Sequence, residues 1–271
     1  NKACEMVIQY PQRICCLTEE TTEVLYALGE EDRIVGISGF TVRPKRARKE
    51  KPKVSAFIDA DIPKIESLKP DLILAFSDIQ ADITRELIAR GQTVFTFNQR
   101  TISEILNTIV LIGSLVGRQA DAEVFAQSLA ENVERVRLES AKVSRRPKVY
   151  FEEWPDPMIS GIAWVSELIE IAGGEDIFAE KRSGSLAKDR FISSEDVLER
   201  KPDIIIGSWC GKKVKKDQIM ARPLWETIPA VQDSCIYEID SSLILQPGPA
   251  ALTDGLAELR KIIMLAQREV V

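Results

Sequence analysis

The stretch GRQADAEVFAQSLAENVERVRLESAKVSRR, from Gly117 to Arg146, decides the fold of this chain. Apolar residues recur in it at spacings of three and four, broken at Ser140, and most positions between them carry polar or charged side chains. This pattern predicts one long amphipathic helix from Arg118 to Arg146, which buries one face and ends before Pro147. The residues of the buried face are expected to be Ala122, Phe125, Leu129, Val133, Val136 and Val143. About 25 helical residues span roughly 38 Å, so this helix can bridge two lobes, although an ordinary surface helix is the alternative.

Strands and helices alternate on both sides of this stretch, as the hydrophobic periods and turn residues indicate. Strands are expected at residues 13–17, 33–38, 68–76, 93–97, 148–154, 201–209 and 235–240. Helices are expected at residues 19–28, 62–68, 81–90, 101–116, 164–172 and 195–200, and from Pro249 onward. The order predicts an α/β fold with two Rossmann-like lobes that contain parallel sheets, namely residues 1–117 and residues 147–271, joined by the helix at 118–146.

A short repeat supports two lobes of the same kind. KPDLIL begins at Lys69 and KPDIII begins at Lys201, one on each side of the long helix. Each segment follows a short predicted helix and leads into a loop with an aromatic residue, Phe76 or Trp209. Such a turn before a buried strand is common in α/β proteins, so the symmetric placement carries more weight than the similarity itself.

Polar residues mark where several helices begin, and one long segment has no helical period. Thr18 is expected to cap the first helix, Thr101 with Glu104 forms a capping box, and Ser194 is expected to cap the helix at 195–200. Residues 39–53, GFTVRPKRARKEKPK, are predicted to form a basic loop. Such a cluster can hold an anionic ligand, and a solvated loop is the alternative.

Composition excludes several classes of function. The 271 residues carry a net charge of −6, which argues against nucleic acid as a partner. No run of 18 apolar residues is present, so no membrane span is expected. The chain contains no histidine, which excludes Ser-His-Asp and Cys-His catalysis and His-rich zinc sites. No signal peptide is visible, and since the chain starts without Met, removal of a leader by processing is one expectation and a start chosen by design is the alternative.

The five cysteines form no CxxC pair, and their odd number leaves no full set of intrachain disulfides. We therefore expect buried free thiols, and the neighbours within a strand should point to opposite faces of its sheet. The cysteines are Cys4, Cys15, Cys16, Cys210 and Cys235.

Open parallel sheets bind ligands beyond the carboxyl ends of their strands, so the residues that follow each predicted strand are the candidates for a binding site. Aromatic, amide and charged side chains dominate this set, which suits a large flat or amphipathic ligand in a cleft between two lobes. The predicted ligand-binding residues are Phe40, Arg43, Phe76, Asn98, Arg100, Glu153, Trp154, Trp164, Trp209 and Gln246. The alternative for each tryptophan is a place in the core.

Motifs for catalysis or nucleotide binding are missing. Glu152 and Glu153 are neighbours on a predicted strand, so only one of them can face a cleft, and no second acid forms a glycosidase pair. No GxGxxG and no GxxxxGK[ST] motif occurs. Catalytic residues and metal ligands are therefore not predicted.

The order of segments resembles that of a known family. It runs RICCLTEETTEVLYALGEEDRIVGIS, PKV, IESLKPDLILA, the long helix, VSELIEIAGGEDIF and EDVLERKPDIII. This order, over nearly the whole chain, resembles the helical-backbone class of substrate-binding proteins of ABC importers, which includes vitamin B12-binding, ferric-siderophore-binding and haem-binding proteins. VSELIEIAGGEDIF and KPDLILAF are most similar to the cobalamin-binding branch.

This resemblance implies the class III periplasmic binding protein fold, with two lobes joined by one rigid helix and a shallow ligand cleft between them. It implies cobalamin or a related corrinoid as ligand, with a ferric siderophore or haem as the alternative. In this family an acidic residue six positions before the KPD lysine docks on the membrane permease. Glu195 has that position in the second lobe, whereas the first lobe has Pro63, so Asp61 and Glu66 are expected to substitute. The family's tryptophan six positions before the second docking glutamate is Asp189 in this chain.

The resemblance also implies a binding protein without catalytic activity and without a resident cofactor. Its expected partners are a small-molecule ligand and an ABC transporter permease, and it meets the membrane only through that permease or a lipid anchor. We expect a monomer that binds no nucleic acid. A periplasmic or cell-surface location is expected, with a cytoplasmic location as the alternative. A chelatase-like enzyme on a related two-lobed fold is the alternative of another class, which the absence of histidine disfavours.

Overall fold

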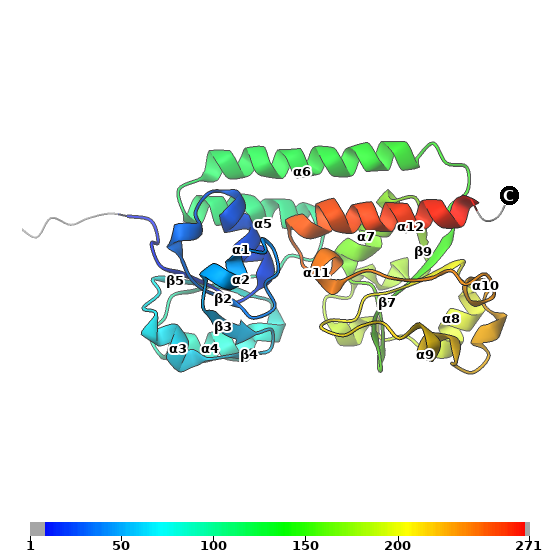
Figure 1. Ribbon diagram of the computed structural model, residues 1–271, viewed down its shortest axis with the longest axis horizontal. Coiled ribbons are helices and arrows are strands. Elements are labelled where there is room, and N and C mark those ends of the chain that lie inside the picture. The colour runs from blue at the N-terminus through cyan, green and yellow to red at the C-terminus, as the bar shows by residue number, and fades with distance from the viewer. Residues whose placement is uncertain (1–8, 269–271) are drawn as a thin grey trace, which may run out of the picture. The chain divides into compact units, whose positions relative to one another are not determined.

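The computed structural model describes residues 9–268, which form two compact α/β units, each with its own sheet (Figure 1). Unit 1 contains residues 9–99 and 106–126, and unit 2 contains residues 100–105 and 127–268. The predicted fold class, with two α/β lobes and a long helix, is confirmed. Cys4 lies outside the described residues.

Unit 1 is built around a six-stranded sheet in the order β4-β3-β2-β1-β5-β6, in which every pairing except β3–β4 is parallel. Its strands are β1 (Ile14–Cys16), β2 (Ile34–Ser38), β3 (Lys53–Ala56), β4 (Asp59–Ala60), β5 (Leu72–Phe76) and β6 (Val94–Phe97). The helices that begin before the long helix are α1 (Glu19–Ala27), η1 (Glu31–Arg33), α2 (Ala47–Glu50), α3 (Ile62–Ser67), η2 (Asp78–Gln80), α4 (Ala81–Ala89) and α5 (Ile102–Leu115). All five residues of β5 are buried, as its continuous apolar run predicts for a central parallel strand.

Unit 2 contains a second sheet in the order β11-β10-β7-β8, with β9 pairing to β7. Its strands are β7 (Lys148–Pro155), β8 (Met158–Ser160), β9 (Glu175–Asp176), β10 (Ile204–Gly207) and β11 (Ile236–Glu238). Its helices after the long helix are α7 (Ala163–Ile171), η3 (Ala179–Ser183), η4 (Ala187–Arg190), α8 (Ser194–Arg200), α9 (Lys216–Met220), η5 (Trp225–Thr227), α10 (Pro229–Gln232), α11 (Ser241–Ile244), η6 (Ala251–Gly255) and α12 (Leu256–Arg268). Tyr150 lies in the core with Phe178 and Trp225 edge-on at 5.8 and 6.1 Å between ring centroids.

The long helix is α6 (Gln119–Ser140), which begins in unit 1 and continues into unit 2 (Figure 1). The predicted buried face is confirmed for Ala122, Leu129, Val133 and Val136, while Phe125 is half-buried. The prediction of its end was wrong, because the helix stops at Ser140 and Val143 lies beyond it. Between Ser140 and Pro147 the only apolar residues are Ala141 and Val143, so a further turn would bury too little to stabilise it. None of the helices within residues 9–268 is long and apolar enough to cross a membrane.

The KPD repeat is a repeat of conformation as well as of sequence. Lys69 and Lys201 both have left-handed backbone conformations, with φ of 50° and 49°. The following aspartate then binds the start of the neighbouring strand. Asp71 accepts hydrogen bonds from the backbone N–H groups of residues 12 and 13, at 2.7 and 2.9 Å. Asp203 accepts one from the N–H of Lys148, at 2.8 Å. The two units therefore connect a helix to a central strand in the same way.

Removing either aspartate side chain should destabilise its own unit. We expect Asp71→Ala and Asp203→Ala each to lower the free energy of unfolding by about 1–3 kcal/mol, because charge-assisted hydrogen bonds to the backbone are lost. Urea denaturation measures the change. Asp82→Ala, which removes a carboxylate that is paired with Arg85 but almost fully exposed, is the control and should change little. Equal effects at all three positions would contradict this role of the repeat.

Helix starts agree with the sequence at some positions and differ at others. The Thr101–Glu104 capping box is confirmed by reciprocal bonds of 3.2 and 3.0 Å. The cap of α8 is Ser193, whose hydroxyl accepts from a backbone N–H at 3.1 Å, and the prediction of Ser194 was wrong. The Ser194 hydroxyl instead accepts the indole N–H of Trp225 at 2.7 Å. Since both serines can cap, the position of this tryptophan decides between them.

Three further predictions can be compared with the structure. Thr18 occupies the N-cap position of α1, but its hydroxyl donates to Glu20 and does not cap the helix. The segment at 39–53 is not only a loop, because the buried side chain of Ala47 anchors the short helix α2. Buried thiols outside any disulfide are confirmed for Cys15, Cys16 and Cys235, whereas the prediction was wrong for Cys210, which is half-buried in the loop after β10. Burial raises the pKa of Cys15 to about 12 and that of Cys16 to about 11.

Candidate functional site

The carboxyl ends of β7 and β10 lie side by side in unit 2. Glu152 pairs in parallel register with Gly207, and the N–H of Ser208 donates to the carbonyl of Glu152 at 2.9 Å. This pairing brings Glu153 and Trp154 close to the loop that begins at Ser208, as the sequence predicted for two parallel strands. The edge of the sheet in unit 2 therefore carries several of the predicted ligand-binding residues.

Glu152 is fully buried and anchors a polar network behind this edge. Both Arg222 Nη atoms donate to its carboxylate, at 2.5 and 3.0 Å. The Tyr150 hydroxyl and the Trp209 indole N–H donate to the same carboxylate, at 2.8 and 3.1 Å. Burial and this carboxylate raise the pKa of Tyr150 well above its usual value. Since all donors and acceptors of this cluster lie inside the unit, its role is to hold the edge in place.

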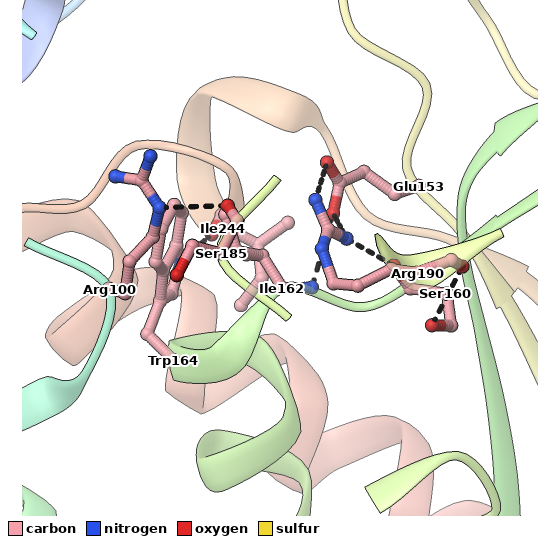
Figure 2. Close-up of polar contacts among 8 residues, drawn as sticks. All are labelled: Arg100, Glu153, Ser160, Ile162, Trp164, Ser185, Arg190 and Ile244. Atoms are coloured by element: carbon pink, nitrogen blue, oxygen red, sulfur yellow. Dashed lines mark hydrogen bonds and ion pairs between the residues drawn. The ribbon is translucent and has the colours of Figure 1, made fainter. Parts of the chain in front are cut away.

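Glu153 points away from this network, as expected for a neighbour on a strand. Its carboxylate accepts from Arg190 Nη1 and Nη2, at 2.7 and 3.1 Å, and from the N–H of Ile162 at 3.1 Å (Figure 2). Arg190 is itself 2% exposed. The sequence predicted Glu153 as a ligand contact, whereas the structure engages both of its oxygens in holding Arg190 and the start of α7.

The three tryptophans of unit 2 that were predicted as ligand contacts differ in exposure. Trp164 is 2% exposed and its N–H donates to the Ile244 carbonyl at 2.8 Å, so it is a core residue (Figure 2). Trp209 is 4% exposed and contacts the hydrophobic core of unit 2. Trp154 is half-buried, and Lys212 Nζ lies 4.5 Å from its ring centroid. Of these three, only Trp154 combines a position at the edge with substantial exposed surface.

Two further predicted contacts lie in unit 2. Arg100 is half-buried and its Nε donates to the Ser185 carbonyl at 3.2 Å (Figure 2). Gln246 is buried in the turn between α11 and the final helix. The structure therefore places Arg100 and Gln246 on different segments from the Glu152–Trp154 strand end.

The predicted residues of unit 1 follow three different strands. Phe40 follows β2 and is 42% exposed, and Asn98 follows β6 and is exposed. Phe76 ends β5 with its side chain buried. Arg43 donates from Nε to Glu23 on α1, at 3.0 Å. The carboxyl ends of the strands in unit 1 thus carry an exposed aromatic ring and an exposed amide, while the side chain of Phe76 contributes to the core.

Glu20 is a residue of this edge that sequence reasoning missed. It lies in the first turn of α1, directly after β1, and is 2% exposed. Its Oε1 accepts from the Thr18 hydroxyl at 2.8 Å, while Oε2 is buried without a hydrogen-bond partner. Burial raises the pKa of this carboxyl to about 7. In the sequence it read as an ordinary acidic residue at a helix start, and nothing in the pattern indicates its burial.

The raised pKa of Glu20 should make the stability of the protein depend on pH. The folded protein holds the proton more tightly than the unfolded chain, so stability should fall as pH rises from about 4.5 to 7 and level off above that. We expect Glu20→Gln, which mimics the protonated acid, to remove about 3 kcal/mol of this dependence. Urea denaturation at pH 5 and pH 8 measures it. Parallel pH profiles of the variant and the wild type would contradict the assignment.

Two of the predicted docking residues, Glu195 and Asp61, lie at the starts of two equivalent helices, whereas Glu66 lies in the last turn of α3. Glu195 is exposed in the first turn of α8. Asp61 is the N-cap of α3, and its carboxylate accepts the Lys64 N–H at 3.1 Å. Glu66 pairs with Arg90 at 3.3 Å. Glu195 therefore presents its carboxylate at the surface, whereas both candidates in unit 1 also make contacts within their own unit.

Three surface hollows of unit 2 lie away from the edge described above. One of about 610 Å³ lies between α6 and α12, one of about 440 Å³ lies beside α7, and one of about 590 Å³ lies along α6. None of the predicted ligand-binding residues lines any of the three. We therefore keep the carboxyl ends of the strands in each unit as the candidate ligand-binding site, because the aromatic, amide and charged side chains lie there.

Known proteins resemble the chain over nearly its whole length. The family described as "Periplasmic binding protein" matches residues 14–243. An uncharacterized ABC transporter substrate-binding lipoprotein, YvrC of Bacillus subtilis (strain 168), is 28% identical over 262 residues, which covers 93% of this chain and 80% of the relative. A vitamin B12-binding protein of Vibrio cholerae is 26% identical over 264 residues, which covers 95% and 91%.

Solved structures show the same fold. A possible iron-binding periplasmic solute-binding protein from Staphylococcus epidermidis ATCC 12228 superposes with a TM-score of 0.78 at 26% identity, covering 94% of this chain and 99% of the other. The vitamin B12-binding protein BtuF of Vibrio cholerae gives 0.74 at 23% identity, covering 96% and 100%. Staphylococcus aureus IsdE, complexed with heme, gives 0.79 at 20% identity, covering 94% and 99%.

Proposed function

Because the chain belongs to the periplasmic binding protein family, we propose that it is the substrate-binding component of an ABC importer that binds cobalamin or a related corrinoid and delivers it to a membrane permease. The carrying observation is the similarity to vitamin B12-binding relatives over 95% of the chain. Relatives are named as lipoproteins or periplasmic proteins, which supports action in the periplasm or at the cell surface. The ligand is cargo, so no resident cofactor is proposed.

The residues at the sheet edges suit an amphipathic ring compound. In unit 2 the half-buried Trp154 offers an aromatic surface next to a lysine. In unit 1 Phe40 and Asn98 offer an exposed ring and an exposed amide. Aromatic surface with a few polar groups is the chemistry that binds a macrocycle with amide side chains. These residues therefore form the proposed contact set.

Haem and ferric siderophores are the alternatives among ligands, since structural neighbours include proteins described as iron-binding or heme-bound. Proteins hold haem iron through His, Cys, Met or Tyr. The chain has no histidine. The hydroxyls of Tyr26 and Tyr150 donate to Glu50 and Glu152, and both tyrosines are buried. A corrinoid can carry both axial ligands of its cobalt with it and needs none from the protein, whereas haem would depend on another residue of this chain, such as the half-buried Tyr237 or Cys210.

An enzyme on a related fold, such as a chelatase, is the candidate of another class. The relatives reported above are named as binding proteins, and the chain lacks histidine for general acid–base chemistry. The residues that looked most suited to chemistry, Glu152 and Glu153, are each engaged with an arginine. Binding without turnover is therefore the function that the site favours.

Co-elution of a coloured ligand tests the proposal directly. We expect the protein to retain cyanocobalamin through gel filtration and to release it unchanged, with the absorbance of the bound compound following the protein peak. Haem and ferric siderophores form the other arms of the same experiment. Retention of haem or a siderophore in place of every corrinoid would move the assignment to that ligand, and conversion of the compound would indicate an enzyme.

Association with the permease should depend on Glu195. We expect Glu195→Lys to leave ligand affinity unchanged and to weaken binding to the permease roughly three- to tenfold at low salt, because an exposed ion pair is lost. Glu199→Lys on the same helix is the control, since it makes the same charge change on another exposed residue. The difference should shrink as salt screens the charges.

The helix dipole offers a different reason for an acid at this position. In that case Glu195→Lys would lower stability by some tenths of a kcal/mol and leave permease binding unchanged at low salt. Asp61→Lys and Glu66→Lys complete the series for unit 1. A smaller loss of permease binding in these two variants than in Glu195→Lys would support docking that depends more on unit 2 than on unit 1. We expect this because Asp61 and Glu66 also make contacts within their own unit.

A further inference from the structure

A lysine-rich segment, separated by three residues from the end of β10, lies at the edge of the sheet in unit 2. Residues Gly211–Lys216 read GKKVKK and are called the lysine loop below. Its four lysines are exposed, and the only acidic residue close behind them in sequence is Asp217. This concentration of positive charge stands out in a chain whose net charge is −6.

The lysine loop is held against the sheet by its single apolar residue. Val214 is buried in the same core cluster as Trp209. Its N–H donates to Glu238 Oε1 at 3.0 Å. A Cβ on Gly207 of β10 would lie 2.7 Å from a Val214 methyl group, so the close approach of the loop requires glycine there. With Val214 fixed, two lysines are presented on each side of it.

The lysines have no carboxylate partner of their own. None of the four makes an ion pair with any residue in the range 9–268. Lys212 Nζ lies 4.5 Å from the ring centroid of Trp154, and Lys216 Nζ lies 5.9 Å from that of Tyr237. Apart from the Glu238 carboxylate that accepts the Val214 N–H, the loop charges are offset by aromatic faces at Lys212 and Lys216 and by solvent, which leaves the lysines available to an anion.

The other basic segment of the chain, at residues 43–53, also contains lysines without an ion pair among the described residues, but its arginines are engaged within unit 1. Arg43 pairs with Glu23 at 3.0 Å, and Arg46 pairs with Glu31 at 2.5 Å. Arg48 Nη1 donates to backbone carbonyls of residues 39 and 41, at 2.6 and 3.1 Å. Its arginines thus contact α1, η1 and the backbone just before the segment. Because Lys212 of the lysine loop lies beside the half-buried ring of Trp154, the lysine loop is the stronger candidate for an anion site.

We infer that the lysine loop binds an anionic oxygen group of the ligand, with Lys212 and Lys213 as the main contacts, beside the ring of Trp154. The loop follows a strand at the edge where parallel sheets bind ligands, and unpaired lysines attract phosphate and carboxylate groups. This inference rests on the proposed function and narrows its substrate class. In a corrinoid the group is the phosphodiester of the nucleotide arm, and in haem it is a propionate carboxylate.

A small polyanion tests the loop independently of the transported ligand. Tripolyphosphate is titrated at low salt into the wild type and into the double variant Lys212→Met/Lys213→Met, which keeps the apolar stems of the side chains. The control is Lys142→Met/Lys261→Met, which removes the same charge from exposed positions elsewhere in unit 2. We expect only the loop variant to lose affinity, roughly three- to twentyfold, and the loss to shrink in salt. Equal binding by all three proteins, or no binding by the wild type, overturns the inference.

The ligand arm identifies the source of the anion. The loop variant should bind cyanocobalamin several-fold more weakly, and dicyanocobinamide, which lacks the phosphodiester, as well as the wild type does. Equal weakening for both corrinoids would overturn the role of the lysines in reading the phosphate. If no corrinoid binds to the wild type, the proposed cargo is wrong, while the tripolyphosphate titration still decides about the loop.

Discussion

Arg222→Met should lower the free energy of unfolding by about 3–5 kcal/mol, because it leaves a charged carboxylate in the core without its partner. Glu152 is fully buried, and Arg222 supplies two of the four hydrogen bonds that it accepts. The Tyr150 hydroxyl and the Trp209 N–H cannot neutralise the charge. We therefore expect the largest loss of stability among single polar substitutions in unit 2 at this pair.

Urea denaturation measures this loss, and two further variants separate its causes. Glu152→Gln/Arg222→Met removes both charges and keeps an acceptor for the tyrosine or the indole, so it should recover a substantial part of the stability. Arg137→Met breaks an ion pair with Glu134 in which both side chains are 52% exposed, and it should cost less than about 1 kcal/mol. If Arg222→Met is no worse than Arg137→Met, the buried network does not stabilise the unit.

Trp154→Ala should weaken ligand binding by about 1–3 kcal/mol, or roughly 5- to 150-fold in Kd, if its ring packs on the macrocycle. The ring is half-buried, its N–H donates to the Asp156 carbonyl at 3.0 Å, and Lys212 lies over it. These contacts hold the ring in place before a ligand arrives, which reduces the entropy lost on binding. Isothermal titration with cyanocobalamin measures the effect.

Trp209→Ala is the matched comparison. The sequence assigns Trp209 the same stacking role, but the structure buries it and engages its N–H with Glu152. Truncating Trp209 should therefore act mainly on stability and lower the unfolding free energy by about 3–5 kcal/mol. Trp154→Ala should lose less unfolding free energy than Trp209→Ala, because the Trp154 ring only partly packs against the same core. Normal ligand affinity in Trp154→Ala would remove this edge of unit 2 from the binding site.

The class of fold could be predicted from the sequence because it depends on periodicity along the chain. The apolar stripe of α6 indicates which face of the helix is buried. The continuous apolar run of β5 indicates a buried strand, and the KPD repeat indicates where a strand begins. The Thr101–Glu104 capping box was also predictable, because both of its partners lie within four residues. Local patterns of this kind need no knowledge of distant neighbours.

The sequence by itself thus determined two α/β units, the long helix and the strand ends where polar and aromatic groups gather. Only the tertiary structure decided which of those groups are accessible. Trp154 lies near the end of β7 and Trp209 follows the neighbouring strand β10, yet Trp154 is half-buried and Trp209 is buried. The sequence likewise did not predict the burial of Glu20, or that Ser193 and not Ser194 caps α8. Exposure and pKa depend on which side chains pack around a group, and these come from segments far apart in the chain, so no local pattern encodes them.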